Sequence, residues 1–125
     1  MKIINNSIFC IFLIIFSNSC FAFDLDGKYA LDSSYDCSIE IVIDRKSFYS
    51  RVNKSEMRGK LGIVDEDKEL YLTFHGLVGS FPESDVKAEY KDSMIFIQNY
   101  GNSINDFTVF EDCSSKYLIL EKDFK

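Results

Sequence analysis

The stretch Cys37-Ser-Ile-Glu-Ile-Val-Ile-Asp44 decides the fold, because apolar and polar side chains alternate along it. Its apolar set consists of Cys37, Ile39, Ile41 and Ile43, and its polar set of Ser38, Glu40 and Asp44. Successive side chains of a β-strand point to opposite faces, so a period of two indicates a strand with one buried face. We therefore predict that this segment forms one wall of an apolar core.

Similar short segments recur along the chain, separated by polar turns. After a lead-in at 23–31, further strands are expected at 48–52, 57–63, 69–78, 85–91, 94–97, 107–110 and 117–120. No segment beyond residue 22 repeats apolar residues at helical spacing within a capped window. Short turns favour an up-and-down meander, and about eight strands can close and so remove exposed edges. We predict an all-β fold, a small single-domain antiparallel β-barrel, with an open β-sandwich as the alternative.

Residues 1–22 read as a secretory signal peptide. Lys2 gives a positive start, the apolar run spans 8–16, and small or polar residues lead to Ala22, where cleavage is expected. The apolar run is too short to cross a bilayer, which needs about 20 residues. The barrel domain is thus expected at 23–125, in a protein that is periplasmic or secreted. Acylation of Cys20 is the alternative, and membrane attachment is expected only in that case.

Removal of the leader takes Cys10 and Cys20 with it and leaves Cys37 and Cys113. Exported proteins meet an oxidising environment, where an even number of cysteines indicates disulfides. We predict one disulfide between these two residues, which are 76 positions apart in the sequence.

Charge and composition narrow the classes of partner. The chain has 14 Lys and Arg against 20 Asp and Glu, and only Lys2 lies in the leader, so the domain is acidic. Nucleic-acid binding requires basic surfaces, so we expect no nucleic-acid partner. The short leader and the Lys-, Ile- and Asn-rich composition are typical of a bacterial protein.

The sequence offers little for catalysis. His75 is the only histidine, no Gly-x-Ser-x-Gly segment exists, and both remaining thiols are expected in the disulfide. The acidic residues cluster in turns without the spacing of a calcium loop, and no Cys-x-x-Cys pair suggests zinc. We predict no enzymatic activity, no metal and no cofactor.

Two features are candidates for contact with a partner. The first is the loop after the strand at 69–78, which carries apolar side chains where other turns are charged; its candidate residues are His75, Leu77, Val78, Phe81 and Glu83. Burial against one end of the barrel is the alternative explanation for its apolar members.

The second feature is a basic cluster within sixteen residues, interrupted by a single acid, Glu56. Its members are Arg45, Lys46, Arg51, Lys54, Arg58 and Lys60. Contact with an anionic group, such as a phospholipid headgroup, a glycan or an acidic protein loop, is one reading of this cluster. A solvated hairpin is the simpler alternative.

Asp26-Gly-Lys-Tyr29 resembles the Gly-x-aromatic opening of lipocalin-like barrels. The resemblance covers four residues, and it implies a barrel without carrying a function across.

Taken together, these features predict an exported, non-catalytic binding protein of the bacterial cell envelope. An immunity or inhibitor-type protein that binds a toxin or hydrolase is the favoured function. The alternative is a lipocalin-like barrel that binds a small apolar ligand or lipid, for which the chain has 12 Phe and 7 Tyr as lining material.

Overall fold

The computed structural model describes residues 24–77, 85–101, 105 and 108–124. These residues form eight strands: β1 Gly27–Ala30, β2 Ile39–Asp44, β3 Ser47–Val52, β4 Ser55–Glu66, β5 Glu69–His75, β6 Asp85–Lys91, β7 Met94–Gln98 and β8 Tyr117–Asp123. Across these described ranges, no helix is long and apolar enough to cross a membrane. The predicted leader, residues 1–22, lies outside them.

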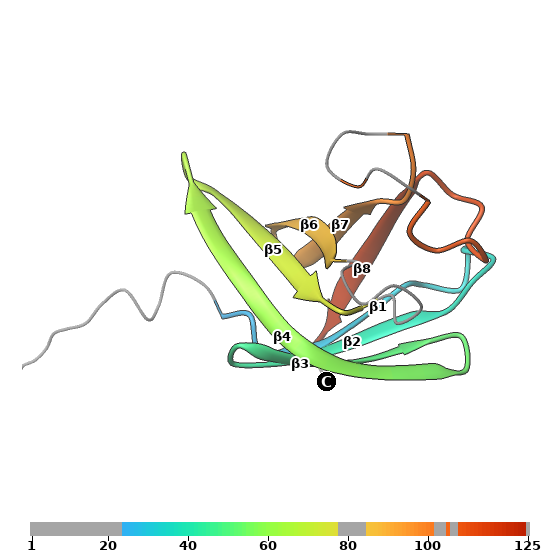
Figure 1. Cartoon of the computed structure of the whole chain (residues 1–125), viewed down its shortest axis with the longest axis horizontal. Coiled ribbons are helices and arrows are strands. Elements are labelled where there is room, and N and C mark those ends of the chain that lie inside the picture. Colours follow the sequence, from blue (N-terminus) through green and yellow to red (C-terminus); the bar gives the residue numbers. More distant parts are fainter. Residues whose placement is uncertain (1–23, 78–84, 102–104, 106–107, 125) are drawn as a thin grey trace, which may run out of the picture.

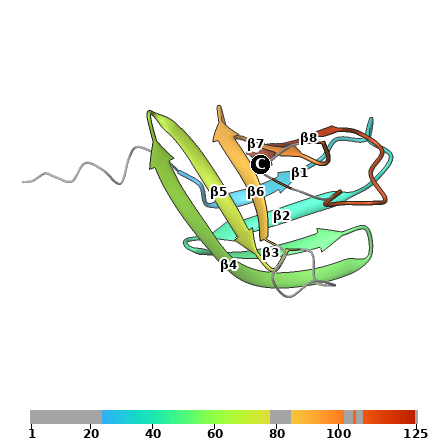
Figure 2. The same ribbon diagram turned by 45° about the horizontal axis from the view of Figure 1, so that its top comes forward.

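The strands follow one another around a closed antiparallel barrel (Figures 1 and 2). Closure is made by β1, which pairs with β2 on one side and with β8 on the other, where Lys28 lies opposite Asp123. The barrel prediction is therefore confirmed, and the open sandwich is not the fold. Closure leaves no strand at the end of a sheet, which is the usual site of unwanted strand pairing.

Strand β4 is twice as long as β3 and bends from one neighbour to the other. Its first half pairs with β3, ending at Ser47 opposite Lys60, and its second half pairs with β5, beginning at Leu61 opposite Phe74. In Figure 1, β4 runs beside β3 at one end and rises beside β5 at the other. The strand thus turns a corner of the barrel.

Two of the hairpin turns have the backbone that tight antiparallel pairs require. Asp67 and Lys68 join β4 to β5 with φ of 52° and 69°, and Asp92 and Ser93 join β6 to β7 with φ of 53° and 63°. Positive φ at both central residues is typical of type I′ turns, whose twist matches that of the flanking strands.

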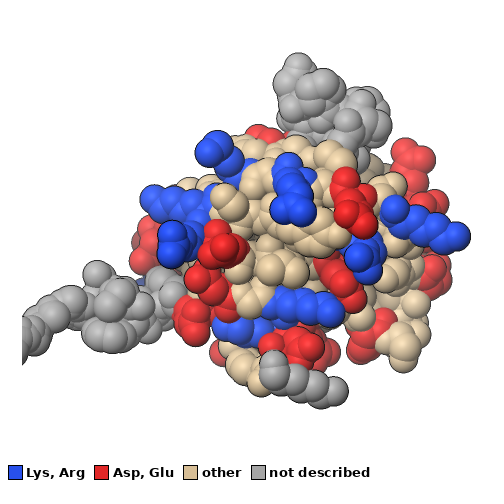
Figure 3. Space-filling view, turned by 90° about the horizontal axis from the view of Figure 1, so that it is seen from below, with Lys and Arg blue, Asp and Glu red and all other residues tan. Residues whose placement is uncertain are grey.

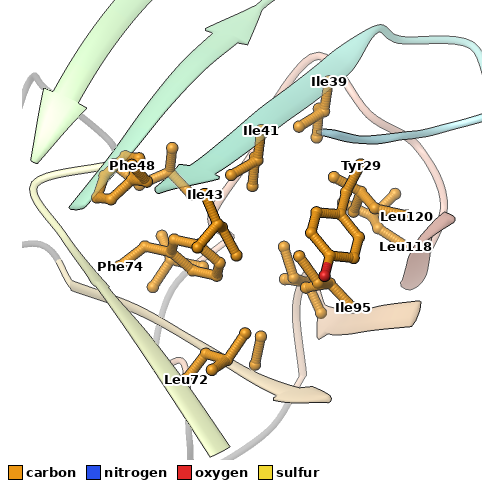
Figure 4. Close-up of a cluster of buried hydrophobic side chains, with 14 of the residues drawn as sticks. Tyr29, Ile39, Ile41, Ile43, Phe48, Leu72, Phe74, Ile95, Leu118 and Leu120 are labelled. Atoms are coloured by element: carbon orange, nitrogen blue, oxygen red, sulfur yellow. The ribbon is translucent and has the colours of Figure 1, made fainter. Parts of the chain in front are cut away.

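Every strand contributes to the core. The alternating set of the opening stretch, Ile39, Ile41 and Ile43, is at most 1% exposed. Figure 4 shows these side chains converging with others from the opposite wall of the barrel. Phe48 and Phe74 meet edge to face with ring centroids 5.2 Å apart, a favoured geometry for aromatic pairs.

The strand predicted at 107–110 is wrong. Thr108, Val109 and Phe110 belong to the long connection between β7 and β8, and these two strands pair directly with each other. Phe110 is buried, as an inward strand residue would be. Its backbone, however, bonds to the side chain of Asn99 instead of to a neighbouring strand.

Candidate binding surfaces

The disulfide closes one end of the barrel. Cys37 lies just before β2 and Cys113 in the connection between β7 and β8, with their Cα atoms 5.1 Å apart. The predicted pairing is confirmed. The bond joins the start of the second strand to the approach to the last one.

Asn99 joins several backbone groups at the same end of the barrel, a role that was not predicted from the sequence. Its side chain is fully buried, and Nδ2 donates to the carbonyl oxygens of Phe110 (3.1 Å), Cys113 (3.0 Å) and Ser115 (3.2 Å). Its Oδ1 accepts from the backbone N–H of Phe110 at 2.7 Å. The alternation of side chains along β7 could have predicted its burial, because Ile95, Ile97 and Asn99 lie on the same inward face of β7 and its extension.

Side-chain bonds tie the neighbouring loops to this connection. Asn53, in the turn after β3, accepts from the backbone of Ser38 and donates to Asp112. Asp36 accepts from Ser114, and these hydrogen bonds hold the pKa of its carboxyl below the ordinary value. The loops at this end are thus held together by side-chain hydrogen bonds as well as by the disulfide.

The residues of the predicted contact loop differ in their surroundings. His75, at the end of β5, is half exposed and pairs with Asp85 across the sheet, with Nδ1 3.0 Å from Oδ2. Leu77 is 2% exposed and belongs to the core, which agrees with the alternative that apolar side chains of this loop are buried against one end of the barrel. The other three residues of that candidate set, Val78, Phe81 and Glu83, lie outside the described residues.

The six basic residues are spread over both ends and the outer face of the β2–β4 segment. Arg45 and Lys46 form the turn between β2 and β3, Lys54 lies in the turn between β3 and β4, and the other three lie on β3 and β4. Acids lie among them: Arg51 is 3.8 Å from Glu56, and Glu40 lies opposite Arg51. Glu40 is also 3.5 Å from Lys28 of β1. Figure 3, which views the molecule from the side of these strands, shows charges of both signs around uncharged atoms.

A row of three residues crosses the middle of this face. Val42 lies opposite Tyr49, and Tyr49 lies opposite Arg58, on three successive strands. The Arg58 guanidinium lies over the Tyr49 ring, 4.8 Å from its centroid, and Val42 is 37% exposed. We call these three residues the Tyr49 row. On one side of the row lie Glu40, Arg51 and Glu56, which are opposite one another on the same three strands. Lys28, opposite Val42 on β1, continues the row and pairs with Glu40.

Contacts on this face also favour the charged form of Arg51. A hydrogen bond with Tyr49, followed by the charge interactions with Tyr49 and Glu56, raises the pKa of its guanidinium above the ordinary value. The face therefore combines apolar and aromatic side chains with a neighbouring row of charged ones.

In the part of the chain that the structure describes, no three His, Cys, Asp or Glu side chains are grouped closely enough to hold a metal ion. No protein-family model, no curated protein and no solved structure matches the chain. Fold and surface define the class: a closed, eight-stranded antiparallel barrel, joined by a disulfide at one end, with a mixed-charge outer face centred on an aromatic residue.

Proposed function

We propose that the protein is an exported, non-catalytic binding protein of the bacterial cell envelope, of the immunity or inhibitor type, which binds a toxin or hydrolase through the Tyr49 row. The observation that carries this proposal is the row itself, with Val42, Tyr49 and Arg58 aligned across three strands. Tyr and Arg are enriched among the residues that dominate protein–protein binding energy.

The surroundings of the row support protein recognition. Interfaces commonly have an apolar and aromatic centre enclosed by a polar rim that excludes water. Val42 and Tyr49 supply an apolar and aromatic centre, and the Lys28–Glu40 and Arg51–Glu56 pairs supply charged groups along one side of it. Arg58 adds a planar donor whose geometry suits a carboxylate on the partner.

The scaffold supports it as well. The row lies on paired strands of a closed barrel, so its backbone is already ordered before a partner arrives. Ordering of loops and side chains on binding lowers affinity, and a surface built on paired strands avoids much of that loss. The disulfide is compatible with an oxidising, exported location.

The test is affinity capture from envelope extracts of the source bacterium. The full chain is expressed with its own leader, and the protein purified from the periplasm serves as bait. Arg58→Ala and Tyr49→Ala are compared with Arg45→Ala, which removes the same charge as the first variant but lies in a turn. We expect one stoichiometric protein partner whose affinity falls by about 2 kcal/mol in the two row variants and stays unchanged in the control.

Two results would contradict the proposal. One is that no protein is captured by the wild-type bait. The other is that all three variants capture the partner equally well. Because Tyr49 is half-buried, its variant is first shown to melt near the wild-type temperature, and Arg58→Ala tests the row independently.

A small apolar ligand remains the second candidate function. The observation that favours it is a pocket at the end of the barrel opposite the disulfide, whose lining includes none of the residues of the Tyr49 row.

A further inference from the structure

The end of the barrel opposite the disulfide contains an open pocket of about 440 Å³. Small-molecule sites usually have volumes of about 300–1,000 Å³, so this pocket has room for a small ligand. The ends of β5, β6 and β8 and the two type I′ turns meet there. Its lining consists of Asp24, Lys68, Leu70, Tyr90, Lys91, Asp92, Ser93, Lys122 and Phe124.

Lys122 is the most enclosed charged side chain of this lining. Its side chain is 11% exposed, and Nζ donates to the backbone carbonyl oxygen of Asp24 at 2.9 Å. The nearest carboxylate oxygen, Oδ2 of Asp24, is 3.9 Å away, beyond hydrogen-bond distance. An ammonium group has three donors, so Lys122 has the capacity to bind an oxygen of a ligand in addition to that carbonyl.

The path of this side chain is built into the fold. Lys122 crosses Gly27, where an added Cβ would lie 2.8 Å from the lysine Cε. Its Nζ also lies 5.9 Å from the centroid of the Tyr29 ring and 5.8 Å from that of Phe124. Packing thus holds the amine at the mouth of the barrel.

The other side of the pocket is apolar. Leu70 is 2% exposed and Tyr90 is half-buried, so together they form a floor. Phe124, near the end of the described chain, is 78% exposed. A large aromatic side chain in that state gains free energy when a ligand covers it.

The charges of the lining favour one anionic group. Lys68, Lys91 and Lys122 face two acids, Asp24 and Asp92, which leaves a local excess of one positive charge on an otherwise acidic protein. An ammonium beside an apolar floor suits a molecule with one charged end and an apolar body.

We propose that this pocket binds a single-chain amphiphile with a carboxylate headgroup. The headgroup accepts from Lys122, and the apolar chain covers Leu70, Tyr90 and Phe124. This function goes beyond protein binding at the Tyr49 row and uses none of the residues of that row.

The proposal is tested by isothermal titration calorimetry of the periplasmic protein with decanoate, below its critical micelle concentration. Acetate, which has the headgroup without the chain, and decanol, which has the chain without the charge, are titrated in parallel. We expect decanoate to bind more tightly than either. Absence of decanoate binding, or equal binding of acetate or decanol, would overturn the proposal.

Variants locate the site. Lys122→Met keeps an unbranched apolar stem as far as Cε and removes the charged amine. We expect decanoate to bind this variant about tenfold more weakly, the loss of one charge-assisted hydrogen bond. Phe124→Ser should also weaken binding, whereas Tyr117→Ser, which changes a 59% exposed aromatic at the other end of β8, should not. Because Phe124 is so exposed, its variant tests the site even if Lys122→Met fails to fold.

Backbone NMR separates this proposal from that of the Tyr49 row. Decanoate should shift the amide signals of Leu70, Tyr90 and Ser93 and leave those of Val42 and Tyr49 in place. Unchanged affinity in both pocket variants, or shifts confined to the Tyr49 row, would refute the pocket and leave protein binding at that row to be judged by affinity capture.

Discussion

Asn99 shows how one side chain can replace a strand. Four of its hydrogen bonds satisfy backbone groups of Phe110, Cys113 and Ser115, all in a connection that forms no ladder. Buried backbone groups need partners, and here a side chain supplies them. Alternation at 107–110 predicted a strand because Phe110 points inward, but local alternation carries no information about which group will satisfy the backbone.

Asn99→Ala should therefore be strongly destabilising. The substitution removes the partner of the Phe110 N–H and of the carbonyl oxygens of Cys113 and Ser115, at about 1–3 kcal/mol for each group left unsatisfied and without simple additivity. The Phe110 carbonyl oxygen still accepts from the N–H of Cys113. We expect a loss of at least about 3 kcal/mol in the free energy of unfolding, measured by urea denaturation. Thr108→Ala, an exposed change in the same connection, is the control and should stay within about 0.5 kcal/mol of wild type. A similar, small effect of both variants would show that the amide network does not hold this loop.

Tyr29 predicts how the protein responds to alkali. Its hydroxyl donates to the carbonyl of Leu25 at 2.7 Å, and burial, followed by its interaction with Tyr90, raises its pKa far above the ordinary value of 10.0. In the unfolded chain Tyr29 ionises near pH 10, whereas in the folded chain it stays protonated. The unfolded state then binds fewer protons, so stability is fully retained below pH 10 and decreases as the pH rises above it.

The measurement is tyrosinate absorbance between about pH 9 and 11, the range in which an unperturbed tyrosine ionises. Folded wild-type protein and folded Tyr29→Phe should show the same total change in tyrosinate absorbance over this range, because Tyr29 does not ionise in the folded state. The stability of the variant should fall less steeply above pH 10. An amplitude smaller by one tyrosine in Tyr29→Phe would show that the wild-type hydroxyl is accessible to ionisation.

In β4, the alternation of apolar and polar residues predicts the strand but does not predict the burial of every residue in it. Alternation placed a strand at 57–63, and the structure extends it to Ser55–Glu66. Leu61 is buried as expected, but Ile63 is 39% exposed although it lies opposite the buried Leu72. The ladder with β3 ends at Lys60, so Ile63 lies beyond the part of β4 that is paired with β3. Such a bend depends on the lengths of the neighbouring strands, which the pattern within β4 does not contain.

Two glycines of this strand, Gly59 and Gly62, differ in the space available for a Cβ atom. A Cβ on Gly59 would lie 2.3 Å from the backbone oxygen of His75 and 2.8 Å from the Phe48 ring. A Cβ on Gly62 would meet first the tip of the His75 side chain, at 3.2 Å, which can move aside. Gly59 therefore permits a close approach of β5, whereas Gly62 does not have that role.

We expect Gly59→Ala to destabilise the barrel by about 2 kcal/mol or more, as overpacking of a well-packed site does. Gly62→Ala should change the free energy of unfolding by less than about 1 kcal/mol. Thermal denaturation of both variants, under the same buffer conditions, compares them. Equal melting temperatures would show that β5 does not approach β4 as closely as described.

The architecture of the whole molecule was largely predictable from the sequence. Short alternating segments with brief turns define an antiparallel meander, and the need to remove edges favours closure, which the pairing of β1 with β8 supplies. The disulfide followed from the cysteine count once Cys10 and Cys20 were assigned to the leader. The candidate surfaces were less predictable, because the Tyr49 row and the pocket at Lys122 depend on register between strands.

The disulfide contributes to stability by restricting the unfolded chain. Its cysteines are 76 positions apart, and loop-closure entropy for such a separation corresponds to about 4–5 kcal/mol. The variant Cys37→Ser/Cys113→Ser should lose stability of this order in urea denaturation. Reduced wild-type protein is the control, and its free energy of unfolding should equal that of the double variant. A variant as stable as the oxidised protein would mean that the remaining contacts at that end already fix the loops.

The most direct test of a barrel fastened by Cys37 and Cys113 is peptide mapping of the full chain, expressed with residues 1–22 in a bacterial host. The unreduced protein is alkylated under denaturing conditions, digested and analysed by mass spectrometry. We expect the peptide with Cys37 to be recovered joined to the peptide with Cys113. Recovery of both cysteines as separate, alkylated thiols would contradict it.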